Sequence, residues 1–439
     1  MSATNNIKKL LDIQDEHITF EGDCVHEEEY KGEICTFVTG KLTYDPKYCE
    51  KCNAKNIDYL VYKNGTQTSR ITLPITGVKP TYLRLKKQRF FCKACERSFT
   101  AKSPIVKKHC FISKQTRAQV LIKSAETQTI SSISRDCSVS TSTVQRVITE
   151  GAKPFKFSYQ SLPENMSFDE FKYVKGKMAF EYINAETGDI LGILSKRDGR
   201  TIKNHFIANY HLKQLKKVKT ITVDMNASYV GIIKELFPQA DIIIDRFHIV
   251  QLINRSMNKT RIRIMNSFKT SNSADMKKYR RLKGYWKLLL KNQTDLSLTE
   301  YKYYRLFGQR TEAGIVEEML DYDEELRVNY NTYQRLLNAI KNKDYDDLEN
   351  LVNTKYDKLL STYMKTSIKT LRKHLPYIKN SLIYPFNNGR IEGINNKIKI
   401  LNRIAYGYRN FNNYKNRIIL HFKLKPIVQN DKKKHSEAA

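Results

Sequence analysis

Two Cys-x-x-Cys pairs, Cys49/Cys52 and Cys92/Cys95, constrain the fold of this chain more than any other feature. Each pair places two thiols on one tight turn, and two such turns complete a tetrahedral zinc site. The 39 residues between the pairs exceed the usual spacing of about 15 to 20 residues, but strands between them can fill that gap. We therefore predict a structural zinc site that serves folding rather than catalysis; four unrelated core cysteines are the alternative.

The segment around these cysteines, residues 44–99, has the pattern of a small β module. Short runs rich in aromatic and branched residues alternate with polar turns, which is typical of antiparallel strands. The expected strands cover residues 59–62, 70–73 and 82–85, and an expected turn covers residues 63–65. We assign residues 44–112 to a zinc-ribbon-like module that follows an N-terminal segment, residues 1–43.

Residues 113–153 change to the spacing of amphipathic helices. A turn at residues 138–140 places Ser140 as the cap of a last helix, residues 141–150, whose inward positions are apolar. The outer face of this helix carries Thr141, Ser142, Gln145 and Arg146. Because glutamine and arginine read adenine and guanine edges in the major groove, we predict a helix-turn-helix. An ordinary three-helix bundle with a polar surface is the alternative.

The charge balance narrows the choice of partner. Lys and Arg total 77 against 45 Asp and Glu, which gives a net charge of +32. Such a field concentrates polyanions, so nucleic acid is the expected partner. A basic membrane-surface protein is the competing explanation, but no stretch approaches the roughly 20 apolar residues that span a bilayer. The N-terminus lacks the pattern of an export signal, so we expect a cytoplasmic, nucleoid-associated protein without a membrane partner.

Apolar runs alternate with helical segments over residues 160–250. The expected strands cover residues 166–171, 178–183, 190–194, 218–223 and 242–244, with helices at 202–210 and 229–237. This order indicates a mixed sheet with helices on its faces. Residues 251–383 are nearly all compatible with helix, and so long a block indicates a helical insertion rather than a loop. The predicted fold is therefore multidomain α/β, with a disordered tail at residues 426–439.

Two acids lie where apolar strands are expected. Asp169 sits inside the apolar run of residues 166–171, and Asp224 ends the run that begins at Ile221. A carboxylate in or at the end of a buried strand is costly unless it is paired or metal-bound, and two on adjacent strands can share divalent ions. Each alone can also be a strand-end aspartate that caps the next helix.

Glu392 is the only acid among nine Lys and Arg residues between Arg390 and Lys425. A solvated helix face normally mixes charges, so a single carboxylate here suggests metal coordination beside a phosphate backbone. A second basic run has twelve Lys or Arg residues between Gln251 and Lys291 against Asp275 alone. Both runs indicate DNA contact, with solvated helices as the alternative.

Three carboxylates of this kind can hold two metal ions about 3.5 to 4 Å apart and activate water or a DNA 3′-hydroxyl for attack on phosphate. Asp245 ends the run of residues 242–244, and His248 follows shortly after it. We place Asp245 and His248 near the metal site, as groups that support its ligands or contact DNA. A strand-end Asp245 paired with Arg246 is the alternative.

At this point the order of parts resembles the DDE transposases of bacterial insertion sequences, specifically the ISL-three family, over nearly the whole chain. The residues that carry the resemblance are Phe168-Asp169-Glu170, Val223-Asp224-Met225, Asp245-Arg-Phe-His248, Asn388-Gly-Arg-Ile-Glu-Gly393 and the run from Leu401 to Phe411. The resemblance implies an RNase H-like catalytic domain, residues 160–250 and 384–425, interrupted by the helical insertion. It also implies that Asp169, Asp224 and Glu392 are catalytic and bind two Mg²⁺ or Mn²⁺ ions.

The primary hypothesis is a transposase that binds the terminal inverted repeats of its element and target DNA as a homo-oligomer. The expected DNA contacts are Thr141, Ser142, Gln145, Arg146, Arg390, Lys397, Lys399, Arg403 and Arg409. A DNA-binding regulator with an inactive catalytic scaffold is a second hypothesis, against which the intact acids argue. A nuclease of the same fold that does not join strands is a third.

Overall fold

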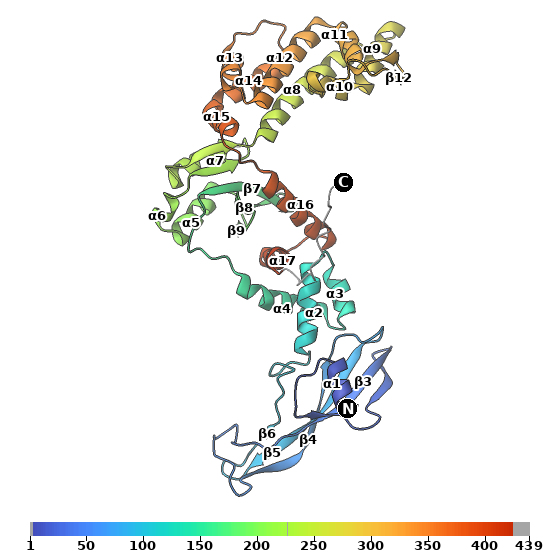
Figure 1. Cartoon of the computed structure of the whole chain (residues 1–439), viewed down its shortest axis with the longest axis vertical. Helices are drawn as coiled ribbons and strands as arrows, with labels where there is room; N and C mark the ends of the chain where they lie inside the picture. The colour runs from blue at the N-terminus through green and yellow to red at the C-terminus, as the bar shows by residue number, and fades with distance from the viewer. Residues whose placement is uncertain (1–2, 226, 425–439) are drawn as a thin grey trace, which may run out of the picture. The chain divides into compact units, whose positions relative to one another are not determined.

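A computed structural model describes residues 3–225 and 227–424 of the chain (Figure 1). The chain divides into two compact units, and the first is built from both ends of the sequence. Unit 1 comprises Met1–Lys156 and Lys397–Ala439, and unit 2 comprises Phe157–Asn396. Among the described residues, no helix is both long enough and apolar enough to span a bilayer.

Unit 1 begins with a six-stranded sheet. Its elements are α1 (Ala3–Leu10), β1 (Ile18–Thr19), β2 (Val25–Tyr30), β3 (Glu33–Leu42), β4 (Val61–Thr72), β5 (Thr81–Cys92) and β6 (Arg97–Thr100). The strand order is β1-β3-β5-β4, with β2 on β3 and β6 on β5. β3 pairs in parallel with β5 from Thr36↔Thr81 to Leu42↔Lys87. The expected division after residue 43 therefore does not separate two modules, because the N-terminal strands share backbone hydrogen bonds and a core with the strands around the cysteines.

The predicted turn at residues 63–65 is wrong. These residues belong to β4, and the pairing of β4 with β5 shifts register between Lys63 and Thr66. Gly65 has a φ of +72°, which a glycine adopts without steric cost, and its carbonyl accepts a hydrogen bond from Gln88 Nε2 at 2.8 Å. The glycine thus marks a β-bulge that keeps one long strand continuous instead of a hairpin turn.

Four helices of unit 1 pack around a second buried cluster. They are α2 (Lys114–Ala125), α3 (Ile130–Asp136), α4 (Thr141–Ala152), which runs into the short 3-10 helix Lys153–Phe155, and α17 (Phe411–Lys423). Ser140 caps α4 as expected, with its side chain accepting from the backbone N–H of Thr143. The buried cluster at their centre includes Val120, Val144 and, from α17, Leu420.

Helix α17 is bound to the end of α2 by buried polar contacts. Arg417 Nη2 donates to the carbonyl oxygens of Glu126 and Gln128 at 3.0 and 2.7 Å. His421 Nδ1 lies 2.6 Å from the carbonyl oxygen of Ala125. The segment 384–425, which was expected to belong to one catalytic domain, is divided between the two units, because its described residues from Lys397 pack with unit 1.

Unit 2 is built on a mixed five-stranded sheet. Its strands are β7 (Asn165–Val174), β8 (Lys177–Asn184), β9 (Ile190–Leu194), β10 (Thr220–Val223) and β11 (Asp241–Ile244), in the order β11-β10-β7-β8-β9. β8 runs antiparallel to β7 and β9, whereas β10 is parallel to β7 and β11. The helices between β9 and β11 are α5 (Gly199–Asn209), α6 (Leu212–Leu215) and α7 (Ala227–Leu236). α5 and α7 cover one face of the sheet, where Phe168 and Phe206 are buried together.

The helical block between β11 and residue 383 has its own core. Its helices are α8 (Arg246–Ser267), α9 (Ser273–Gly284), α10 (Trp286–Leu290), a 3-10 turn (Gln293–Asp295), α11 (Glu312–Leu320), α12 (Glu324–Asn342), α13 (Tyr345–Asn353), α14 (Thr362–Lys373) and α15 (Leu375–Ile383). The block was expected to be entirely helical, but it is not. A hairpin of β12 (Lys302–Tyr304) and β13 (Gly308–Arg310) interrupts it, held by contacts of Tyr304 and Phe307 with the Tyr285 ring.

Candidate functional site

Asp169 and Asp224 lie at equivalent positions on neighbouring parallel strands of unit 2. β7 and β10 pair with Ser167 beside Thr222, and each aspartate follows two residues later. Because side chains alternate along a strand, Asp169 points to the sheet face opposite to Phe168. The strand register thus brings together two acids that are 55 positions apart in the sequence.

Burial and charge repulsion both act on Asp169. Burial first, and then the nearby charge of Asp224, raise the pKa of Asp169 to about 6. Two hydrogen bonds oppose this shift: the backbone N–H of Glu170 donates to Oδ1 and Asn395 Nδ2 donates to Oδ2, each at 2.7 Å. Two carboxylates that repel each other in a partly buried site form an arrangement that a divalent cation stabilises.

Helix α16 (Gly389–Ile404) carries polar groups toward these acids. Asn388, Glu392 and Asn395 have the i, i+4, i+7 spacing of one helix face. Asn388 Nδ2 donates to Asp224 Oδ1 at 3.2 Å, while Asn395 holds Asp169. Both asparagines are buried. Asn388, just before α16, and Asn395, within it, therefore each contact one of the two aspartates.

Asp245 and His248 lie at the start of α8, which follows directly on β11. His248 Nε2 lies 2.7 Å from Asp224 Oδ1 and 4.0 Å from Glu392 Oε1. The hydrogen bond to Asp224 is the main cause that raises the pKa of His248, and burial is the main cause that raises the pKa of Asp245. Single ligand atoms of Asp245, His248 and Glu392 all lie within 4.8 Å of one another, a grouping that can hold a metal ion.

Three residues near these acids received no role from the sequence. The helical spacing of Asn388 and Asn395 with Glu392 could have indicated that they share a helix face with this acid. Glu181 lies directly across from Asp169 in the pairing of β8 with β7 and is fully buried. Its signal was the same as that of Asp169, since it is a lone acid inside the apolar run of residues 178–183.

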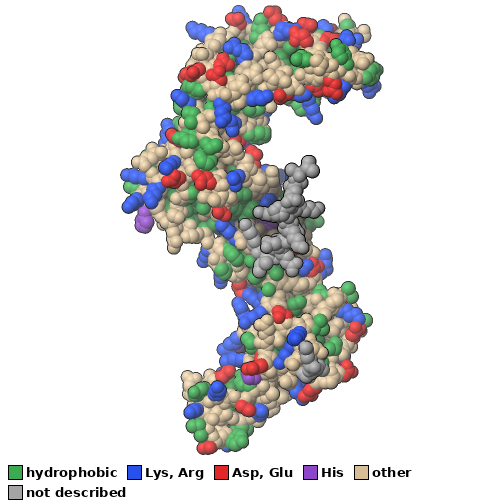
Figure 2. All heavy atoms as spheres, in the orientation of Figure 1, with side chains coloured by type: hydrophobic (Ala, Val, Ile, Leu, Met, Phe, Trp, Pro, Cys, Tyr) green, Lys and Arg blue, Asp and Glu red, His purple; other side chains and the backbone are tan. Residues whose placement is uncertain are grey.

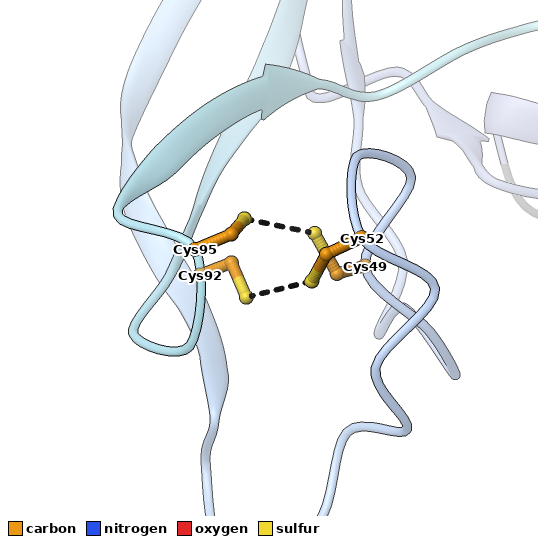
Figure 3. A group of neighbouring side chains, drawn as sticks. All are labelled: Cys49, Cys52, Cys92 and Cys95. Carbon is orange, nitrogen blue, oxygen red and sulfur yellow. Dashed lines mark hydrogen bonds between the residues drawn. The ribbon is translucent and has the colours of Figure 1, made fainter.

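The four expected zinc ligands come together in unit 1 (Figure 3). Sγ of Cys49 lies 3.8 Å from that of Cys95, and Sγ of Cys52 lies 3.8 Å from that of Cys92. All four sulfur atoms lie within 4.8 Å of one another. Burial raises the pKa of Cys49, but backbone N–H groups, first that of Lys51, lower it to about 7, which favours the thiolate form that binds zinc. Burial and the neighbouring cysteines raise the pKa of Cys95.

The expected DNA contacts are accessible, with one exception. Thr141, Ser142 and Arg146 are exposed on α4, while Gln145 is half-buried and lies 3.5 Å from Thr149 Oγ1. The remaining residues are also exposed: Arg390, Lys397, Lys399, Arg403 and Arg409.

The basic run between Gln251 and Lys291 is less available for DNA than its composition suggested. Arg263 pairs with Glu325 and Arg281 with Glu318, in contacts between helices of the block. Lys291 Nζ lies 2.6 Å from Glu312 Oε2, and Arg261 is buried and donates to the carbonyl of Leu282. Figure 2 shows basic and acidic side chains interspersed on the face of this block that it draws. Acids distant in the sequence thus neutralise part of the run.

Comparison with known proteins identifies the class of protein. A family model described as a transposase, that of the ISL3 elements, matches residues 166–418, which is more than half of the chain. A second model, the zinc-finger of the IS204/IS1001/IS1096/IS1165 transposases, matches residues 45–95 and contains both cysteine pairs. The chain belongs to the ISL3 family of transposases, which confirms the resemblance, and the four-cysteine cluster with the zinc-finger match supports a structural zinc ion.

Two curated relatives match parts of the chain. The transposase for insertion sequence element IS1001 of Bordetella parapertussis is 26% identical over 251 residues, which cover 56% of this chain and 58% of that protein. A protein named ATP-dependent protease from Lactococcus lactis subsp. lactis is 42% identical over 110 residues, 25% of this chain and 35% of that protein. The chain therefore matches less than two thirds of the length of either relative.

Proposed function

We propose that the protein is a DNA transposase that cuts and joins DNA with Asp169, Asp224 and Glu392 as catalytic residues. The observation that supports this proposal is that Asp169 on β7 and Asp224 after β10 are neighbours in the strand register, with His248 lying between Asp224 and Glu392 of α16. His248 links two of them, at 2.7 Å from Asp224 and 4.0 Å from Glu392. The sheet order β11-β10-β7-β8-β9 supports an RNase H-like catalytic domain.

The side chains of this site fit divalent cations. Carboxylate oxygens are the ligands that Mg²⁺ prefers, and an added imidazole also suits Mn²⁺. Asp169, Asp224 and Glu392 would hold the ions, with Asp245 and His248 beside them. When bound, the ions would activate a water or a DNA 3′-hydroxyl and stabilise the leaving oxygen. Asn388, Asn395 and His248 orient the carboxylates through their hydrogen bonds.

DNA recognition is proposed for unit 1. α2, α3 and α4 have the arrangement of capped, short helices that supports a helix-turn-helix, with Arg146 exposed on α4. The zinc module and the exposed basic residues of α16 would contact the terminal inverted repeats. Target DNA would then bind at the catalytic site. Homo-oligomeric assembly on two DNA ends belongs to the same proposal.

The test is incubation of the full-length protein with Mg²⁺ or Mn²⁺ and a DNA that carries the sequences flanking its own gene. We expect cleavage and joining at the borders, and loss of both in the Asp224→Asn variant. Full activity of that variant would refute the catalytic assignment. Specific binding without cleavage by the wild type would favour the regulator, and cleavage without joined products would favour a nuclease.

A further inference from the structure

Glu181 is an acid for which the described structure offers no protein partner. Its side chain has an exposed fraction of 0% in the centre of β8. Neither Oε1 nor Oε2 accepts or donates a hydrogen bond within the described part of the chain. Buried carboxyl groups are normally paired, hydrogen-bonded or bound to a metal. This one either takes up a proton, because burial and the charge of Asp169 raise its pKa, or belongs to a site that includes a further group.

The strand register places Glu181 beside the catalytic acids. Its Cα partner in the antiparallel pairing of β8 with β7 is Asp169, so the two side chains lie on the same face of the sheet. Asp224 lies next to Asp169 on the other side, because β10 pairs with β7 two residues earlier in the same register. Three acids thus form a row across β10, β7 and β8.

Among the described residues, the two strand partners of Glu181 carry no positive charge. On the other side of Glu181 its partner in β9 is Ile193, an apolar residue. Asn395, which lies over Asp169, uses its Nδ2 for that aspartate, and its buried Oδ1 has no hydrogen-bond partner among the described residues. A cation at the row would satisfy both the carboxylate and the amide oxygen.

We propose that Glu181 is a fourth acidic ligand of the divalent cation that Asp169 holds. This inference rests on the proposed function, because it assigns a further residue to the same metal site. Glu181 supplies its carboxylate from the β8 side of Asp169, while Asp224 supplies its own from the β10 side. The site then has one more negative charge than the Asp169, Asp224 and Glu392 set provides.

Metal binding without DNA tests this proposal. Mn²⁺ is titrated into the full-length, zinc-loaded protein, and free Mn²⁺ is measured by electron paramagnetic resonance. We expect Glu181→Gln to weaken Mn²⁺ binding by about tenfold or more, and to remove most of the rise in melting temperature that Mn²⁺ produces. Without Mn²⁺ this variant should melt no lower than the wild type, because the substitution keeps the shape of a carboxyl group whose pKa is raised by burial.

The matched control is Glu170→Gln. Glu170 adjoins Asp169 in the chain, but its side chain lies on the other face of β7, where it pairs with Arg197 at 2.6 Å and contacts Tyr229. This variant removes the same charge nearby and should bind Mn²⁺ within about twofold of the wild type. If Glu181→Gln does not fold, as judged by circular dichroism, Glu181→Met takes its place in the same titration.

Asp224→Asn separates failure of this inference from failure of the proposed function. If Asp224→Asn weakens Mn²⁺ binding and Glu181→Gln leaves it unchanged, Glu181 is not a ligand and the inference is overturned. If neither the wild type nor any variant binds Mn²⁺, the carboxylate metal site itself is wrong. Weakened binding in both, with Glu170→Gln unchanged, supports the fourth ligand.

Discussion

Asn395 is the residue through which α16 holds Asp169 in place. Its Nδ2 donates to Asp169 Oδ2 at 2.7 Å from a buried position. A donated hydrogen bond stabilises the ionised form of a carboxyl group, and it opposes the burial that raises the pKa of Asp169. Metal ligands depend on such partners for both orientation and charge.

We therefore expect Asn395→Ala to weaken Mn²⁺ binding and to lower the rate of DNA cleavage, each by about tenfold or more. The neighbouring Asn396 is exposed on the same helix, so Asn396→Ala is the matched control and should behave as the wild type. Mn²⁺ titration and a cleavage time course measure the two effects. Equal behaviour of both variants would mean that the amide does not support Asp169.

The limits of sequence-based prediction at this scale follow from distance along the chain. Asp169 and Asp224 were predicted because each lies in or at the end of an apolar run, and Glu392 because it is the only acid in a basic segment. The role of Asn395 depends on a hydrogen bond across 226 positions, and that of Glu181 on the pairing of β8 with β7. Neither contact can be recognised from a local sequence pattern. The local pattern shows only that Asn395 has helical spacing with Glu392 and that Glu181 lies in an apolar run.

At the scale of elements, the cysteine pairs bind two separate turns of unit 1. Cys92 ends β5 and Cys95 precedes β6, while Cys49 and Cys52 lie before β4. We expect Cys52→Ser to reduce the zinc content from about one ion per chain, because structural zinc sites need all four ligands. Backbone amides of β5 and β6 should then exchange faster with solvent.

Cys110→Ser is the control for this variant, because Cys110 is half-buried outside the four-cysteine cluster. It should retain zinc and the exchange rates of the wild type. Elemental analysis and hydrogen exchange by mass spectrometry measure both properties. Retention of full zinc by Cys52→Ser would contradict the assignment of the four ligands.

Helix α17 should respond to pH through His421. Burial is the main cause that lowers the pKa of His421 below its ordinary value of 6.5, and Lys397 and Arg417 add to this effect. Between that lower pKa and 6.5 the unfolded state binds more protons than the folded state, so stability falls as pH decreases through this window. His421→Gln lacks this titration.

The expected result is that His421→Gln differs most from the wild type near pH 7.5 and less near pH 5.5. Hydrogen exchange of the α17 amides, compared between the two proteins at each pH, provides the measurement. Amides of α12, which belongs to unit 2, serve as the internal reference. A constant difference at all pH values would mean that His421 does not change its proton binding on folding.

Helices and strands were predicted well where the hydrophobic pattern is regular. They were predicted poorly where a single residue or contact determines the local structure. β9 was predicted at its observed bounds, and Ser140 was predicted as the cap of α4. The bulge at Gly65 resembles a turn in sequence, because glycine serves both structures. The hairpin of β12 and β13 was missed because it is short, lies inside a long helical segment and packs against Tyr285, a residue outside it.

At the scale of the whole molecule, the net charge of +32 predicts DNA binding that weakens steeply with salt. Direct phosphate contacts and the overall positive field of the protein predict different effects of a local charge change on the salt dependence of DNA binding. Replacing Lys397, Lys399 and Arg403 by Gln removes exposed charges of α16. If each of them contacts a phosphate, the slope of log K against log salt should decrease by about 2 to 3.

Lys213, Lys216 and Lys217 provide a control with the same change in net charge, from +32 to 32 − 3 = +29. These residues are exposed near α6 and are not among the expected DNA contacts. Their replacement by Gln should leave the slope nearly unchanged. Binding isotherms at several salt concentrations distinguish the two variants, and equal slopes would attribute the affinity to the general field.

The packing of Leu420 against Val120 and Val144 has a consequence for biosynthesis. A ribosome completes α2, α3 and α4 long before it reaches α17, so the apolar surface that α17 covers stays open while all of unit 2 is translated. Products that stop early would leave Val120 and the end of α2 without their cover, and they would be recognised by chaperones and proteases. Only translation through α17 yields a closed unit 1, so truncated chains would be removed before they compete for DNA.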